Sequence, residues 1–285
     1  MSDSRKKILV LGANGNVGRA LVEQLVAQGE SVRAASRNGQ APAGAEGVVF
    51  DHTDPSTHAA ALDGVDRAFL MLPTGHVNVA EVLLPLVRAL ADRRIKVVFQ
   101  SVLGVDADDQ IPYRQVELAL IASGTPHVIL RPNWFADNFH TFWLSGVQQG
   151  VIAVPAGEGR SSFIDTRDIA ASAAAALTNP AFEGQAFNLT GPQALGYADA
   201  AALISEALGR PVRYAAVSDD DFVQGLVGAG VPAVYAGFLA SIFYPVREGW
   251  TAGVSDAVQT LTGRAPRSLA QYVADHVADL GQAAA

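Results

Sequence analysis

The chain has 285 residues, of which 49% are hydrophobic, so it can bury one large core or one core with a smaller cap. Its formal charge of −8, with no compensating block of Lys or Arg, argues against nonspecific binding to nucleic acid or anionic membranes, which need clustered cations. The absence of cysteine excludes disulfides, thiol nucleophiles, iron–sulfur clusters and cysteine zinc sites. The six histidines show no ligand spacing such as HExxH, so we expect no metal site.

The N-terminal segment, residues 1–7, is polar and runs straight into the first predicted strand. It contains no uninterrupted hydrophobic targeting region and no cleavage site. No apolar run elsewhere reaches the length needed to span a membrane. We therefore expect a soluble cytoplasmic protein.

A glycine-rich turn follows the first apolar run. Residues 7–11 predict a strand, residues 12–18 are GANGNVG, and the next segment predicts an amphipathic helix. Gly12 can make the tight turn, Gly15 lets the backbone approach a pyrophosphate, and Gly18 lets the helix lie close to the strand. The helix start adds N–H groups and the positive end of a dipole. We predict a dinucleotide site with contacts from Gly12, Asn14, Gly15, Asn16, Val17 and Gly18.

The glycine spacing is GxxGxxG rather than GxGxxG, so the pattern alone is a weak signal. Its position between a predicted strand and a predicted helix strengthens it. No Gly-Lys-Ser/Thr follows, which excludes a P-loop. The alternative is a glycine-rich turn that only shapes the connection from strand to helix.

The end of the second predicted strand, residues 31–36, favours NADPH. NAD-specific sites carry an acidic residue near this position to hold the ribose 2′-hydroxyl. This chain has Arg37 there, whose planar guanidinium suits a 2′-phosphate. Arg33 is either a second cation for that phosphate or a residue on a solvated sheet edge. We predict NADP(H) over NAD(H), the alternative being that Arg37 is an ordinary loop charge.

Strand-like and helix-like segments alternate through the first half of the chain. The further predicted strands are residues 47–51, 67–72, 96–101 and 127–131, and the predicted helices are residues 56–62, 77–93 and 112–123. This alternation predicts an α/β protein with a Rossmann-type, doubly wound parallel sheet and helices on both faces. Ligands then bind at the carboxyl ends of the strands. The residues expected there include Gly12, Arg37, Asp51, Leu72, Pro73, Ser101, Arg131 and Asn133.

The pattern loosens after Pro132 into shorter segments interrupted by Gly and Pro. We predict an NAD(P)-binding Rossmann core in residues 1–132. Residues 133–285 are predicted to form a mixed region that partly returns to the core and partly makes a smaller substrate-covering cap.

Aromatic residues gather just beyond the strand that ends near Pro132. The predicted wall of a pocket for a flat, apolar substrate consists of Asn133, Trp134, Phe135 and Phe139. Phe135, Phe139 and Phe142 recur at helical spacing. The alternative for such a stripe is plain core or a subunit contact, which would suit a homodimer.

These residues together resemble the NmrA-like, atypical short-chain dehydrogenase/reductase family. That family includes NADPH-dependent quinone and triphenylmethane-dye reductases and also redox-sensing regulators. The resemblance covers nearly the whole chain and is carried by residues 12–18, 36–38, 51–54, 130–139 and 262–268. It implies that Asp51 borders the adenine of the cofactor and that Leu72 and Pro73 border the nicotinamide side.

The chain departs from ordinary short-chain dehydrogenases at their tyrosine–lysine pair. Those enzymes carry a Lys four residues after a Tyr, which helps the phenol exchange protons. Here Tyr113 is followed by Glu117 at the Lys position. A carboxylate one helical turn away disfavours tyrosinate, so we expect Tyr113 to remain a neutral hydrogen-bond donor. Reversible alcohol oxidation, which needs a base, is disfavoured.

The predicted function is an NADPH-dependent reductase that transfers hydride to a planar, apolar, electron-poor acceptor such as a quinone, azo dye, imine or conjugated carbonyl. Tyr113, Ser101 and Glu117 are the candidate catalytic residues, and Ser101 is also a candidate cofactor contact. The alternative for Tyr113 and Glu117 is that they only occupy a helix face. A second hypothesis is an NAD(P)-sensing regulator that binds a protein partner without turnover. A nucleotide-sugar epimerase or dehydratase is disfavoured because those relatives depend on the missing Lys.

Overall fold

The computed structural model describes residues 6–281, which form two compact units. Of the described residues, unit 1 comprises 6–132, 166–189 and 257–264. Unit 2 comprises 133–165, 190–256 and 265–281. The chain therefore leaves unit 1 after Pro132 and returns to it twice.

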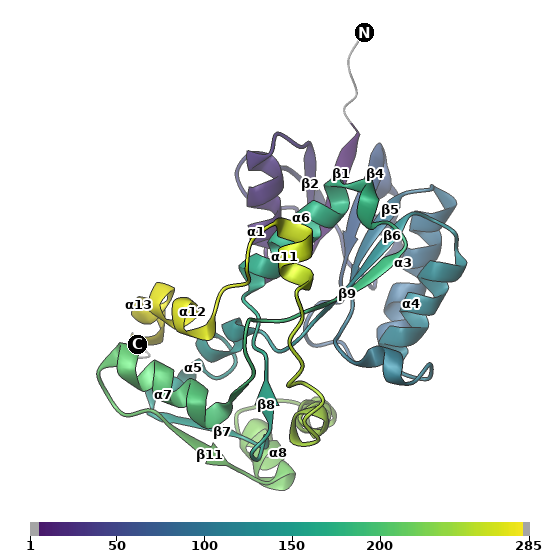
Figure 1. Ribbon diagram of the computed structural model, residues 1–285. Coiled ribbons are helices and arrows are strands. Elements are labelled where there is room, and N and C mark those ends of the chain that lie inside the picture. The colour runs from purple at the N-terminus through teal and green to yellow at the C-terminus, as the bar shows by residue number, and fades with distance from the viewer. Residues whose placement is uncertain (1–5, 282–285) are drawn as a thin grey trace. The chain divides into compact units, whose positions relative to one another are not determined.

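Unit 1 is built on a parallel sheet with the strand order β3-β2-β1-β4-β5-β6-β9 (Figure 1). Its strands are β1 (Lys7–Leu11), β2 (Val32–Ser36), β3 (Glu46–Val49), β4 (Val65–Leu70), β5 (Lys96–Gln100), β6 (His127–Pro132) and β9 (Gln185–Leu189). The direction in which strands are added reverses at β1, which pairs with both β2 and β4. A ligand crevice is expected at the carboxyl ends of the strands beside this reversal. The predicted Rossmann-type fold is confirmed.

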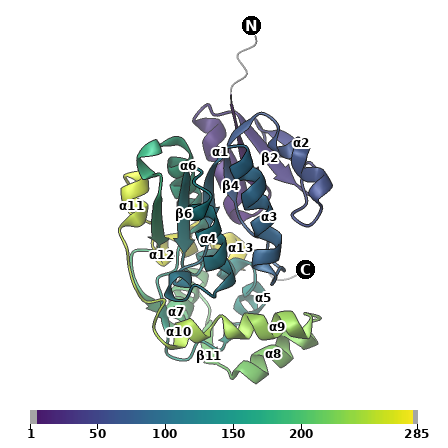
Figure 2. The same cartoon turned by 90° about the vertical axis from the view of Figure 1, so that its right-hand side faces the viewer.

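Helices cover both faces of this sheet. On one face α3 (Val79–Asp92) and α4 (Pro112–Ala122) lie side by side, and on the other lie α1 (Asn16–Ala27), α6 (Thr166–Thr178) and α11 (Ala257–Thr262) (Figures 1 and 2). The shorter helices are η1 (Pro55–Thr57), α2 (His58–Leu62), η2 (Val105–Ala107) and η4 (Pro180–Phe182). The helices predicted over residues 77–93 and 112–123 are confirmed, and the one predicted over residues 56–62 is divided into η1 and α2.

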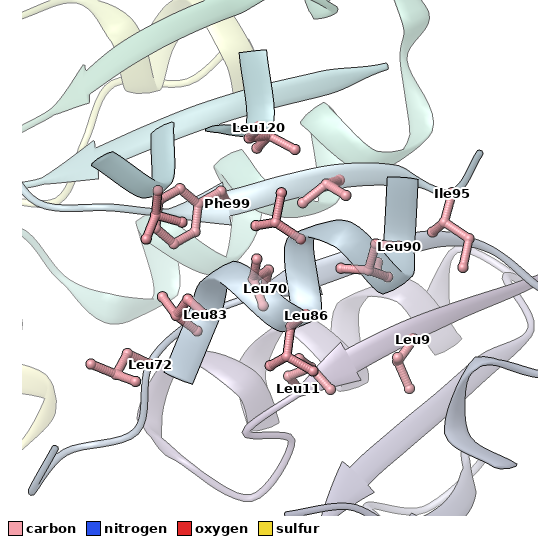
Figure 3. Packing of buried hydrophobic residues seen from close by; sticks show 14 of the residues in the cluster. Leu9, Leu11, Leu70, Leu72, Leu83, Leu86, Leu90, Ile95, Phe99 and Leu120 are labelled. Carbon is pink, nitrogen blue, oxygen red and sulfur yellow. The ribbon is translucent and has the colours of Figure 1, made fainter. Parts of the chain in front are cut away.

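The core of unit 1 fixes the carboxyl ends of β4 and β5. Leu83 and Leu86 recur at helical spacing, and α3 buries them in one cluster with Leu70 of β4 and Phe99 of β5 (Figure 3). The Phe99 ring stacks on Tyr113 of α4, with ring centroids 6.3 Å apart. The first turn of α4 is therefore packed against the last part of β5.

Unit 2 carries two small sheets and several short helices. Strand β7 (Val151–Val154) pairs in parallel with β11 (Arg213–Ala216), and β8 (Arg160–Ser161) pairs antiparallel with β10 (Leu195–Gly196). Its helices are η3 (Ala136–His140), α5 (Leu144–Gln148), α7 (Tyr197–Leu208), α8 (Asp219–Gly228), α9 (Ala233–Ser241), α10 (Tyr244–Arg247), α12 (Leu269–Asp275) and α13 (Val277–Gly281). Across residues 6–281, no helix combines the length and the apolar character that crossing a membrane requires.

Candidate functional site

The glycine turn after β1 brings α1 into very close contact with the end of that strand. Gly12 has a φ of +67°, a left-handed conformation that favours glycine. A Cβ on Gly18 would lie 2.1 Å from the backbone oxygen of Gly12, so a side chain there has no space. The Gly15 amide donates to the same oxygen at 2.9 Å. The backbone therefore takes a path that the glycines at 12 and 18 permit.

The N-terminus of α1 suits an anion. Among the described residues, no side chain caps this helix, whose N-cap is Gly15. The amides of the first helical turn lack acceptors within the helix, and the helix dipole adds positive potential. Asn14, Gly15 and Asn16 are exposed, whereas Val17 and Gly18 are buried. This arrangement fits the pyrophosphate of a dinucleotide.

The turn after β2 is held in place by hydrogen bonds and leaves Arg37 exposed. The Ser36 hydroxyl donates to the backbone oxygen of Gln40 at 2.8 Å, and Asn14 Nδ2 donates to the same oxygen at 3.1 Å. Asn14 thereby joins the glycine turn to the turn that carries Arg37. This link between the two turns could not be predicted from either segment alone.

Arg33 is neither a second phosphate ligand nor a solvated edge residue. Its side chain is buried, and its Nε donates to Glu46 Oε1 at 3.1 Å. Its Nη1 donates to the backbone oxygens of Ala60 and Ala61, at 3.2 Å each. Arg33 of β2 therefore forms hydrogen bonds with both β3 and α2. Of the two arginines, Arg37 is the one that faces solvent.

One acidic and one basic side chain after β3, Asp51 and His52, have shifted pKa values. Hydrogen bonds from the amide and hydroxyl of Thr53 lower the pKa of Asp51, and the positive charge of Arg37 lowers it further. His52 Nε2 donates to the backbone oxygen of Met71 at 3.0 Å, which joins the end of β3 to the end of β4. Burial lowers the pKa of His52 to about 4, so its imidazole is neutral at pH 7. Asp51 is thus an anion beside a neutral ring.

The end of β4 leads directly to the residues expected beside the nicotinamide. Leu72 is buried and lies beyond the last residue of β4, next to Leu83 of α3 (Figure 3). Pro73 follows and is half-buried. The apolar character of both positions suits a flat ring, and their contact with a cofactor remains a prediction.

Glu117 is reassigned from a candidate catalytic residue to an ion-pair partner. It is 0% exposed, and Arg131 of β6 donates to its two carboxylate oxygens, through Nε at 2.9 Å and Nη2 at 2.7 Å. Arg114 Nη1 donates at 3.0 Å. Burial opposes ionisation, but the hydrogen bonds from Arg131 and Arg114, together with the nearby Ser101 hydroxyl, outweigh it and hold the pKa of Glu117 below its usual range. This carboxylate is not available to act on a substrate.

Ser101 and Tyr113, the other candidate catalytic residues, lie next to this ion pair in the fold. Ser101 is buried, and its amide donates to the backbone oxygen of Leu130 at 2.8 Å. Within residues 6–281 its Oγ makes no hydrogen bond of good geometry, but it lies near enough to Glu117 to help lower the pKa of that carboxyl. Tyr113 is half-buried, one helical turn before Glu117.

The side chain of Asn133 makes its hydrogen bonds within unit 2. Its Nδ2 donates to Ser162 Oγ and to the backbone oxygen of Thr251, at 2.7 Å each. Its Oδ1 accepts from the Trp134 amide at 2.8 Å. Both N–H donors of Asn133 are therefore occupied within unit 2, and its place beside a substrate stays a prediction.

The predicted aromatic wall does not form one helical face. Residues 136–140 form a 3-10 helix, so Phe135, Phe139 and Phe142 are not aligned as the α-helical spacing suggested. Phe139 is fully buried and packs against Phe163, with centroids 5.3 Å apart, whereas Phe142 is exposed. Trp134 is half-buried against Phe243. Phe139 therefore belongs to the core, and Trp134 and Phe135 remain predicted pocket residues.

The sheet order and the glycine turn define a Rossmann-type α/β protein. The model of the NmrA-like family matches residues 4–254, and the chain belongs to this family, which confirms the resemblance stated above. The NAD(P)H azoreductase of Xenophilus azovorans is 33% identical over 287 residues, covering 97% of this chain and 100% of the relative. The uncharacterized oxidoreductase YesF of Bacillus subtilis is 33% identical over 273 residues, covering 95% of each chain.

A solved structure shows the same fold over nearly the whole chain. The NADPH-dependent quinone oxidoreductase QOR2 of Escherichia coli, in complex with NADPH, matches with a TM-score of 0.81 and 24% sequence identity. The match covers 95% of this chain and 99% of that chain. All three of these proteins are named as oxidoreductases or reductases, and the names of the azoreductase and of QOR2 also state a nicotinamide nucleotide and azo or quinone chemistry.

Proposed function

We propose that this protein is an NADPH-dependent reductase that transfers hydride to a planar, apolar, electron-poor acceptor such as a quinone or an azo dye. The observation that carries the proposal is the turn from β1 to α1, where a Cβ on Gly18 would lie 2.1 Å from the Gly12 oxygen. This close approach leaves an uncapped helix start for a pyrophosphate. The full-length similarity to an NAD(P)H azoreductase supports the acceptor class.

Residues at the carboxyl ends of successive strands of unit 1 suit the successive parts of this cofactor. The amides of residues 12–18 would hold the pyrophosphate and Arg37 the 2′-phosphate, while Asp51 would border the adenine. Leu72 and Pro73 would border the nicotinamide side. When bound, the nicotinamide supplies a hydride.

On the acceptor side, the candidate residues Tyr113 and Ser101 offer hydroxyl donors. Tyr113 can donate a hydrogen bond to the oxygen or nitrogen that gains negative charge during reduction. Glu117 is held as an anion by Arg131, so it supplies no proton. Positioning of an electron-poor acceptor, rather than acid–base relay, would then carry the rate.

Consumption of NADPH tests the proposal directly. The absorbance of NADPH is followed with a panel of quinones, azo dyes and conjugated imines or enones. Oxidation with at least one acceptor is the expected result. The absence of the tyrosine–lysine pair favours a second candidate, a nucleotide-sensing regulator, and binding of NADPH without consumption across the panel would support it instead.

Arg37→Ala should lower the affinity for NADPH about 10–100-fold, because a charge-assisted contact to a phosphate contributes about 1.5–3 kcal/mol. The affinity for NADH should stay within about twofold, since NADH lacks that phosphate. Both are measured by fluorescence titration. Arg88→Ala, at an exposed position of α3, is the control for loss of one positive charge. Equal affinities of the wild type for both nucleotides, unchanged in Arg37→Ala, would contradict the cofactor assignment.

Tyr113→Phe should lower kcat about 10–100-fold and change KM for NADPH little, because one hydroxyl donor is lost. The phenyl ring keeps the stacking on Phe99, so the free energy of unfolding should fall by no more than about 1.5 kcal/mol, the contribution of one hydrogen bond. Steady-state kinetics and urea denaturation measure the two effects. Unchanged turnover would show that Tyr113 only occupies a helix face.

A further inference from the structure

We propose that Arg131 is a positioning residue for the reductase reaction. Through Glu117 and Asp106 it holds the chain after Ser101 and the first turn of α4 in the arrangement that turnover requires. This inference rests on the proposed function and adds to it a residue that need not touch the cofactor or the acceptor.

One guanidinium joins three elements of unit 1. Arg131 lies at the carboxyl end of β6 and is 7% exposed. Its Nε and Nη2 bind the two carboxylate oxygens of Glu117 in α4, and its Nη1 binds Asp106 Oδ2 in η2. Only an arginine presents donors in a planar fork that can meet one carboxylate with two bonds and a second carboxylate with another.

A second arginine extends this network to the start of α4. Arg114 directly follows Tyr113, and its Nη1 donates to Glu117 Oε2 at 3.0 Å. Its Nε donates to Asp109 Oδ1, also at 3.0 Å. The residue beside Tyr113 is thus tied both to the buried carboxylate and to the loop before α4.

The loop before α4, residues 102–111, depends on these ion pairs. The Leu103 amide donates to the backbone oxygen of Pro132 at 3.1 Å, and Val105 is its buried apolar side chain. Residues 106–110 are exposed. Few apolar contacts therefore hold this loop, and the salt bridges from Arg131 to Asp106 and from Arg114 to Asp109 connect it to β6 and α4.

Among the groups that face Glu117, Arg131 does most to keep its carboxylate ionised. Arg131 faces it from β6, Arg114 from its own helix, and the Ser101 hydroxyl from the end of β5. On the side of α3 the packing is apolar. Removal of Arg131 leaves a buried carboxylate with one cation instead of two, and burial then raises its pKa.

This geometry also gives a physical account of the glutamate at the lysine position. One helical turn after Tyr113, the Glu117 side chain turns inward to Arg131 of β6. Glu117 and Arg131 together fix where α4 lies on the sheet. The pair thus positions the candidate hydroxyl donors without taking part in proton transfer.

The test compares Arg131→Gln with a matched control, Arg67→Gln. Arg67 lies near the amino end of β4 and pairs with Glu30 at 2.9 Å, so the control also removes a paired arginine from the sheet. We expect Arg131→Gln to lower kcat at least tenfold while the Kd for NADPH stays within twofold. Arg67→Gln should keep kcat within twofold. Arg131→Lys keeps the charge without the fork and should recover part of the loss.

The pH profile separates positioning from a general loss of structure. In Arg131→Gln, protonation of Glu117 removes a buried charge that has lost one of its two cations, so kcat relative to wild type should recover as the pH falls. The double variant Glu117→Gln/Arg131→Gln lacks the titrating group and should show no such recovery. An identical pH dependence of the single and double variants would overturn the inference.

Amide hydrogen exchange gives a readout that does not need turnover. Exchange over residues 102–117 should be faster in Arg131→Gln than in wild type, and exchange over residues 8–28 should not change. If Arg131→Gln does not fold, Arg131→Lys is compared in the same way, with a smaller expected change. Unchanged exchange over residues 102–117, or a kcat within twofold of wild type, overturns the inference. A wild type that consumes no NADPH overturns the proposed function, and the exchange result then decides the role of Arg131 by itself.

Discussion

Gly18→Ala is expected to weaken NADPH binding about 5–150-fold, which corresponds to about 1–3 kcal/mol of strain in an overpacked contact. The added Cβ would meet backbone atoms of Gly12 at 2.1 Å and 2.7 Å and the Ala13 Cα at 3.0 Å. None of these is the end of a flexible side chain, so α1 or the turn must move. Because the same turn is proposed to hold the pyrophosphate, the movement acts on binding as well as on folding.

Titration with NADPH and urea denaturation measure both consequences of Gly18→Ala. Gly225→Ala is the control, since Gly225 lies in α8 and its Cβ would meet no described atom within 4 Å. That substitution should leave binding unchanged and stabilise the chain slightly, by up to about 1 kcal/mol, through helix propensity. Wild-type affinity in Gly18→Ala would show that this close contact is not needed for the nucleotide.

The fold was predictable because its signals are local. Most strands of unit 1 through β6 are rich in apolar residues and bounded by turn residues, and the helices between them carry apolar residues at helical spacing. The glycine turn adds a requirement that no other residue type meets at Gly12 and Gly18. Strand order then follows from the rules for parallel α/β connections.

The ion pair of Glu117 was not predictable from the sequence. Its partner Arg131 is 14 residues away, on a different element, and the direction of the Glu117 side chain depends on how α4 packs against the sheet. Helical spacing identified Tyr113 as a neighbour of Glu117 but gave no information about β6. An arginine at the end of a buried strand was the available signal, because a buried cation needs a partner.

Two other expectations failed for related reasons. Strand alternation could not show that α2 offers backbone oxygens to Arg33. Helical spacing of Phe135 and Phe139 assumed an α-helix where the chain forms a 3-10 helix. In both cases a tertiary contact or a local change of helix type overrides a periodic pattern.

His52 should make the protein less stable in mild acid. Its pKa is about 6.5 when the chain is unfolded, and burial lowers it to about 4 in the folded chain. Between these values the unfolded state binds the proton more readily, so the free energy of unfolding falls as the pH falls from 6.5 to 4. The contribution of His52 is fully present above pH 6.5 and decreases by up to about 3 kcal/mol over this window, at about 1.4 kcal/mol per pH unit.

His52→Gln isolates this effect because glutamine can still donate to the Met71 oxygen but does not titrate. Urea denaturation at several pH values should show parallel behaviour of the two proteins above pH 6.5 and a shallower loss of stability for His52→Gln below it. His140, whose pKa burial also lowers, is present in both proteins and cancels in the comparison. Equal slopes below pH 6.5 would mean that His52 takes up its proton in the folded chain, so that the contact with Met71 does not require a neutral, buried imidazole.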